Sequence, residues 1–136
     1  MTRDLSKSVK VSPGTVAALS TDTAISSPVV DTQGYDGLMF AIFFNTLTDA
    51  NATFAVLVEH DDASGFGTAT AVSDSDLIGT EAAAGFQYDD DNETRKIVYI
   101  GSKRYVRLTV TPTGNTGTDP IAILPILGFP KKAPVA

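Results

Sequence analysis

A run of seven consecutive apolar residues, Leu38 to Phe44, constrains the fold of this chain more than any other feature. With the two-residue period of a β-strand, large side chains fall on both faces: Leu38, Phe40, Ile42 and Phe44 on one, and Met39, Ala41 and Phe43 on the other. A strand with one wet face alternates apolar with polar residues. This strand is therefore predicted either to be covered on both sides by its own chain, or to meet another subunit with Met39 and Phe43.

The rest of the chain predicts an all-β fold with little helix. Turn-forming stretches of Asp, Asn, Gly, Thr and Pro separate about eight β-type runs, at 16–19, 28–30, 38–45, 53–60, 85–88, 96–101, 104–111 and 121–127. The only helix candidates are a single turn capped by Ser73 or Ser75, and Glu81–Ala84. This pattern favours an antiparallel two-sheet sandwich, either jelly-roll-like or immunoglobulin-like, although no Cys and Trp pattern supports the latter.

The length of 136 residues predicts one domain with a core of its own. Residues 1–14 are polar and end in Pro13-Gly14, which indicates a flexible or extended N-terminal arm before a sandwich of residues 15–136. The N-terminus also lacks the apolar stretch of a secretory signal, so the chain is expected to be made in the cytoplasm.

Two strand details carry specific expectations. The runs 96–101 and 104–111 are predicted to form a hairpin, with Val106, Leu108 and Val110 inward. Pro120 and Pro125 flank or interrupt the last strand, which predicts an edge position or a bulge there.

Charge and cysteine usage exclude several function classes. Sixteen acidic against ten basic residues give a net charge of −6, which disfavours nucleic acid and anionic membranes as partners. With no cysteine, the chain has no disulfide, thiolate zinc site or cysteine nucleophile. Half of the basic residues gather in one segment and form either a stripe for an acidic partner or a solvated face: Arg95, Lys96, Lys103, Arg104 and Arg107.

No motif predicts catalysis. His60, the only histidine, follows Glu59 and precedes Asp61 and Asp62, but adjacent strand residues face opposite ways, so Glu59 and His60 are not expected to share a site. Phosphate-binding glycine patterns and the G-x-S-x-G nucleophile motif are absent. The segment DDDNE offers oxygen ligands for calcium from Asp89, Asp91 and Glu93, with a solvated turn as the alternative. We therefore predict no enzyme and no cofactor.

Several strand and turn phrases resemble the small β-sandwich virion proteins of tailed bacteriophages, of the head decoration or cement type. They cover most of the chain after about residue 15 and are VVDTQGYDGLMF at 29–40, TFAVLVEHDDASGFGTATAVSDSDLIG at 53–79, KRYVRLTVTP at 103–112, and IAILPILGFPKKAPV at 121–135. The resemblance carries over no residue-level site, because these phrases contain no chemical signature.

The resemblance implies a non-enzymatic structural protein on the outer surface of the phage head, bound to the major capsid protein as a homo-oligomer, commonly a trimer. Met39, Phe43, Arg104 and Arg107 are the residues we expect at oligomer or capsid contacts. Two alternatives stay open: a structural protein of the phage tail or neck, and a carbohydrate- or calcium-binding module that uses the acidic loops at 59–62 and 89–93.

Overall fold

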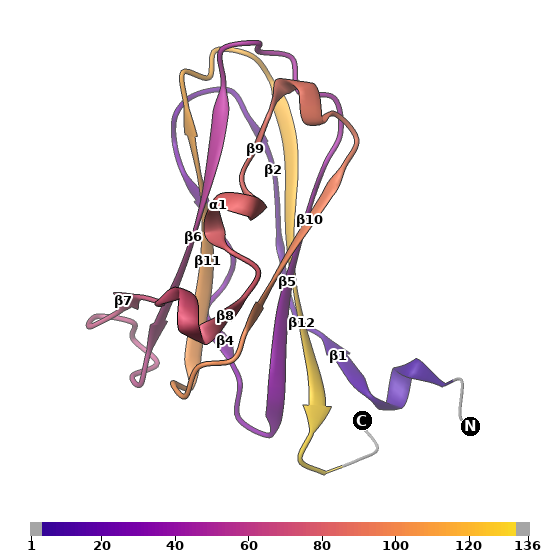
Figure 1. Ribbon diagram of the computed structural model, residues 1–136, viewed down its shortest axis with the longest axis vertical. Coiled ribbons are helices and arrows are strands. Elements are labelled where there is room, and N and C mark those ends of the chain that lie inside the picture. The colour runs from indigo at the N-terminus through magenta and orange to yellow at the C-terminus, as the bar shows by residue number, and fades with distance from the viewer. Residues whose placement is uncertain (1–3, 133–136) are drawn as a thin grey trace.

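The computed structural model describes residues 4–132, and these form two antiparallel sheets packed face to face (Figure 1). Sheet A contains β1 (Val9–Val11), β2 (Thr15–Leu19), β5 (Tyr35–Phe44), β8 (Leu77–Ile78), β10 (Thr94–Tyr99) and β12 (Asp119–Pro130). Sheet B contains β3 (Ile25–Ser26), β4 (Val30–Asp31), β6 (Thr53–Asp61), β7 (Thr70–Ala71), β9 (Phe86–Gln87) and β11 (Tyr105–Thr113). The predicted all-β, two-sheet sandwich is confirmed.

Several of these strands share one position in a sheet. β1 and β2 pair with successive parts of one edge of β12, and β3 and β4 do the same along β11. Sheet A then has the order β1/β2, β12, β5, β10, β8, and sheet B the order β3/β4, β11, β6, β7/β9. With the chain crossing between the sheets at most connections, this order makes the sandwich jelly-roll-like.

Helical structure is limited to short turns. The one α-helix is α1 (Glu81–Ala84), whose first turn is capped by the Thr80 hydroxyl accepting the Ala83 N–H. The 3₁₀ turns are η1 (Leu5–Lys7), η2 (Asp74–Asp76) and η3 (Tyr88–Asp90). The two predicted helical turns near Ser73 and at Glu81–Ala84 are both present.

The core lies between the sheets and uses one parity of each long strand. The inward residues of β5 are at most 3% exposed, and Val106, Leu108 and Val110 of β11 are fully buried, as their alternation predicts. The rings of Phe44, Phe86 and Phe54 stack in sequence at 4.0 and 4.8 Å, which joins sheet A to sheet B through β9.

The predicted hairpin of residues 96–111 is wrong. β10 pairs with β5 and β8 in sheet A, whereas β11 pairs with β6, β3 and β4 in sheet B, so the connection between them crosses from one sheet to the other. The Tyr99 hydroxyl accepts the Lys103 N–H at 3.0 Å and fixes this crossing. Both strands have neighbours on each edge, and Ile97 of β10 and Val106 of β11 both belong to the buried core between the sheets.

Part of the predicted flexible arm belongs to the sandwich. Residues 9–11 form β1 and pair with Ile126 to Gly128 of β12, and the segment before them forms η1. The edge of β12 at these residues would otherwise lack a partner, which is the physical reason for ordering this segment. Residues 1–3 lie outside the described part of the chain.

The expected edge position of the last strand is also wrong, because β12 is continuous and lies between β5 and the β1/β2 position. β2 ends its pairing at Ile123 and β1 begins at Ile126, which leaves a break beside Pro125. Ser12 donates its N–H to the Pro125 carbonyl at 3.0 Å on that side, so the missing N–H of Pro125 faces the break. A central strand therefore accommodates this proline.

Gly14, in the connection from β1 to β2, provides a test of this break. A Cβ atom at Gly14 would lie 2.2 Å from the carbonyl oxygen of Ile123, which is backbone and cannot rotate away. We expect Gly14→Ala to lower the free energy of unfolding by about 1–3 kcal/mol, as overpacking does. Urea unfolding followed by circular dichroism measures this, with Gly65→Ala as the control because a Cβ at Gly65 meets no atom within 4 Å. Equal losses in both variants would contradict the close approach.

Candidate assembly surface

The outward residues of sheet A form rows of apolar side chains across the strands. Paired residues on neighbouring strands point to the same side of a sheet. The longest row crosses five strands and consists of Val11, Ile126, Met39, Val98 and Ile78. A second row joins Val16, Ala122 and Phe43, and a third joins Leu124 to Ala41.

These rows, with Val9 and Phe129, make one continuous surface, which we call the apolar face. The register adds two polar side chains to it, Thr94 beside Phe43 and Lys96 beside Ala41, both on β10. Its largest exposed side chains are Val16 at 82%, Phe129 at 79%, Val11 at 61%, Ile78 at 59% and Phe43 at 44%. Contiguous apolar surface on this scale marks an interaction site, whereas single exposed apolar residues do not.

One end of the apolar face is shaped by Phe129. Its backbone has φ = 51°, a left-handed value that is uncommon outside glycine. The ring lies against Gly37, where an added Cβ would be 2.8 Å from the Phe129 Cδ2 atom. Beside it is an apolar hollow of about 220 Å³ bordered by Met39, Val98 and Ile126. A smaller hollow of about 110 Å³ lies at the other end, bordered by Val16, Phe43 and Ala122.

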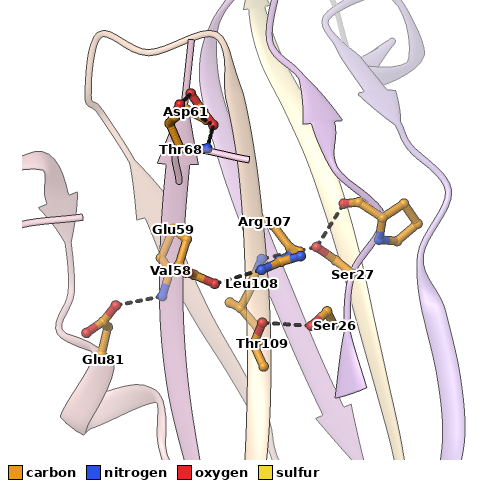
Figure 2. Close-up of polar contacts among 11 residues, drawn as sticks. Ser26, Ser27, Val58, Glu59, Asp61, Thr68, Glu81, Arg107, Leu108 and Thr109 are labelled. Carbon is orange, nitrogen blue, oxygen red and sulfur yellow. Dashed lines mark hydrogen bonds and ion pairs between the residues drawn. The ribbon is translucent and has the colours of Figure 1, made fainter. Parts of the chain in front are cut away.

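The outer face of sheet B is different, because polar and paired side chains cover it (Figure 2). Arg107 of β11 donates to the Glu59 carboxylate of β6 at 2.9 Å, and its guanidinium lies 4.7 Å from the centre of the Phe66 ring. Nearby, the hydroxyls of Ser26 and Thr109 are 2.8 Å apart. The two faces of this sandwich therefore have opposite character.

The four contact residues expected from the sequence do not share one surface. Met39 and Phe43 lie on the apolar face, whereas Arg107 lies on sheet B. Arg104 forms a bidentate pair with Asp31 at 2.7 and 2.8 Å, and this hydrogen bonding lowers the pKa of the Asp31 carboxyl. The predicted basic stripe is likewise divided between the sheets, and Arg95 pairs with Asp90 and Glu93 instead.

Two of the three proposed calcium residues, Asp91 and Glu93, have separate partners. Asp91 accepts the Leu47 N–H at 2.7 Å, and Glu93 forms an ion pair with Arg95 at 2.6 Å. Within residues 4–132, no group of three or more histidine or acidic side chains is arranged to hold a metal ion.

His60 and Glu59 lie on opposite faces of β6, as their adjacency predicts. His60 is buried, and its Nδ1 atom is 2.9 Å from the Tyr99 hydroxyl. Burial lowers the pKa of the imidazole. Asp61 accepts hydrogen bonds from the N–H groups of Ala63 and Thr68 and from the Thr68 hydroxyl, so this carboxylate closes a turn.

A hollow of about 410 Å³ lies beside β6 and is bordered by Phe54, Val56, Glu81 and Phe86. Glu81 of α1 is committed to the strand, because its Oε1 atom accepts the Val58 N–H at 2.6 Å (Figure 2). The Glu81 carboxylate therefore takes the place of a neighbouring strand as the acceptor for the Val58 N–H on this edge of β6.

Sequence reasoning missed a group of buried carboxyls at the loop end of the sandwich. Asp119 is fully buried and accepts the Thr48 N–H at 2.7 Å, while its Oδ2 atom has no hydrogen-bond partner. Burial raises the pKa of Asp119. Asp49 accepts from Thr116 and Asn51, which lowers its pKa to about 2. Nothing in the local sequence distinguishes these aspartates from solvated loop residues.

No protein-family model matches the chain, and no curated protein matches it significantly. In the part of the chain that the structure describes, no helix has both the length and the apolar character to cross a membrane.

Proposed function

We propose that this chain is a non-enzymatic structural protein of a phage virion, and that it decorates the outer surface of the head. The observation that carries the proposal is the difference between the two faces of the sandwich. One face offers a broad apolar surface for assembly, and the other is polar and suited to water.

The character of the polar groups also supports an assembly role. Arg104, Arg107 and Arg95 are held by Asp31, Glu59 and acidic residues of η3 and the turn after it, so they brace loops and strands. Asp49 and Asp61 likewise hold backbone N–H groups. A decoration protein needs a stable polar surface that faces water and an apolar surface that binds the capsid, and it needs no reactive group.

The resemblance noted in the sequence selects the phage head among possible assemblies. In this proposal the chain binds the major capsid protein and is located on the head of the assembled virion. A β-sandwich fold by itself would not select this function, because the same architecture serves unrelated proteins.

Localisation in purified particles tests the proposal. We expect an antibody raised against the chain to label the heads of the phage that encodes it, and mass spectrometry to find the chain in separated heads. Purified chain should also rebind heads from which it has been removed. Detection only in separated tails or necks would replace the proposal with the tail alternative, and absence from particles would overturn both.

A further inference from the structure

We propose that the apolar face packs against the same face of a second copy of this chain, related by a twofold axis. The inference rests on the proposed function, because it names the partner of the same assembly surface. It departs from the trimer that the resemblance implies. A trimer needs two different complementary surfaces on each copy, whereas residues 4–132 carry one continuous apolar face, and a twofold contact pairs a surface with itself.

The size of the apolar face fits a stable dimer. Five strands spaced about 4.8 Å apart span roughly 20–25 Å, and the ten residues from Pro120 to Phe129 on β12 span about 30 Å. The rectangle that encloses the face therefore has an area of about 600–750 Å² on each copy. Stable interfaces bury about 800 Å² per partner, with a lower limit near 600 Å².

The charges allow two copies of an acidic chain to approach through this face. The chain carries a net charge of −6, but no acidic residue belongs to the apolar rows. The one charged side chain in the register of the face is Lys96, on β10 and exposed. β8 pairs with β10 only at Val98 and Tyr99, so Lys96 lies at the edge of sheet A, where its long stem can carry the ammonium group into water and away from the Lys96 of the second copy.

The shape of the apolar face allows one copy to fit against another, because a projection at one end matches a hollow at the other. Phe129 projects at one end, and the hollow bordered by Val16, Phe43 and Ala122 lies at the other. A twofold axis running across the strands places the Phe129 end of one copy over the Val16 end of its partner, and does so twice. The same axis passes near Ala41, which lies on β5 between Leu124 of β12 and Lys96 of β10.

A cysteine cross-link tests the position of the axis. The chain has no cysteine, so any disulfide-linked dimer must form through the introduced thiol. In Ala41→Cys, two copies of the thiol face each other across the axis, so mild oxidation should give a covalent dimer on a non-reducing gel. The matched control is Ala55→Cys, which places the same change on the outward parity of β6 in sheet B. We expect Ala55→Cys to stay uncross-linked under the same conditions.

A charge placed in the interface tests the energetics. Phe43 is 44% exposed on the apolar face and Leu57 is 37% exposed on sheet B, so Phe43→Glu and Leu57→Glu form a matched pair. We expect Phe43→Glu to raise the dimer dissociation constant by about 30-fold or more, because it removes a large apolar contact and places a charge at the hollow that faces Phe129 of the second copy. Leu57→Glu should leave it unchanged. Sedimentation velocity measures both, and circular dichroism confirms that both variants are folded.

Three outcomes overturn the inference: a monomeric wild-type chain at about 100 µM, a trimer by light scattering, or equal cross-linking of Ala41→Cys and Ala55→Cys. These outcomes are separable from failure of the proposed function. A monomer that still rebinds heads would overturn the dimer alone, whereas a dimer that is absent from virions would overturn the virion function alone.

Discussion

Phe40→Ala is expected to lower the free energy of unfolding by about 3–5 kcal/mol, the cost of removing a large buried ring and leaving a cavity. Phe40 is fully buried on the inward parity of β5, where it lies between Pro125 of β12 and Ile97 of β10. These neighbours belong to ladders on both sides and have little freedom to fill the space. Chemical unfolding followed by tyrosine fluorescence and circular dichroism measures the loss.

Phe43→Ala is the matched control on the same strand. Its side chain lies on the opposite face and is 44% exposed, so the same change should cost the isolated subunit about 1 kcal/mol or less. The comparison is made below the dimer dissociation constant, because association would stabilise the wild-type chain. Similar losses for Phe40→Ala and Phe43→Ala would contradict the division of β5 into a core face and an outer face.

Asp119→Asn is expected to raise the free energy of unfolding at pH 7 by about 1–2 kcal/mol, since it removes a buried charge whose Oδ2 atom has no partner. The amide oxygen can still accept the Thr48 N–H that Asp119 now accepts. The nearby Asp49 and Asp91 carboxylates add repulsion to the ionised form of Asp119, in the same direction as burial.

The pH dependence gives this prediction a specific signature. The folded pKa of Asp119 is raised above 3.8, so the folded state loses stability as pH rises from about 3.8 through the folded pKa. The gain from Asp119→Asn should therefore vanish below pH 3.8, where Asp119 is already protonated. Asp49→Asn is the control of opposite sign, because the Asp49 pKa is lowered to about 2 and its loss should destabilise the fold above pH 4. A constant gain for Asp119→Asn across pH would contradict a buried charge as the cause.

Side-chain alternation is the part of this fold that could be predicted from sequence. The inward parity of residues 38–44 and of 105–111 is buried as predicted, because a strand's period of two depends on local geometry alone. The helical turns at Asp74–Asp76 and Glu81–Ala84 were also predictable from the local sequence, although only the second is capped by a side chain, that of Thr80, and Ser73 makes no side-chain hydrogen bond to the first. The two-sheet class followed from many short strands and little helix.

Strand partners could not be predicted in the same way, because pairing depends on residues far apart in the sequence. The hairpin of 96–111 was a reasonable local interpretation, yet β10 pairs with β5, more than 50 residues earlier. The tolerance of Pro125 depends on where β2 stops and β1 starts, which no local pattern encodes. The apolar face could not be predicted for the same reason: Met39 lies beside Val98 and Ile126 only because β5 pairs with β10 and β12.

The central place of β12 in sheet A has a consequence for biosynthesis. β1, β2 and β5 all take their ladder partner from residues 119–130, which follow every other strand in chain order. A nascent chain therefore cannot complete this sheet until residues 119–130 have left the ribosome, and until then the two apolar sides of β5 and its open edge are exposed together. Unpaired edges and exposed apolar surface make folding intermediates prone to aggregation. A sheet that closes this late makes the yield of folded protein depend on β12, and it makes the ribosome-bound chain a natural client for a holdase chaperone.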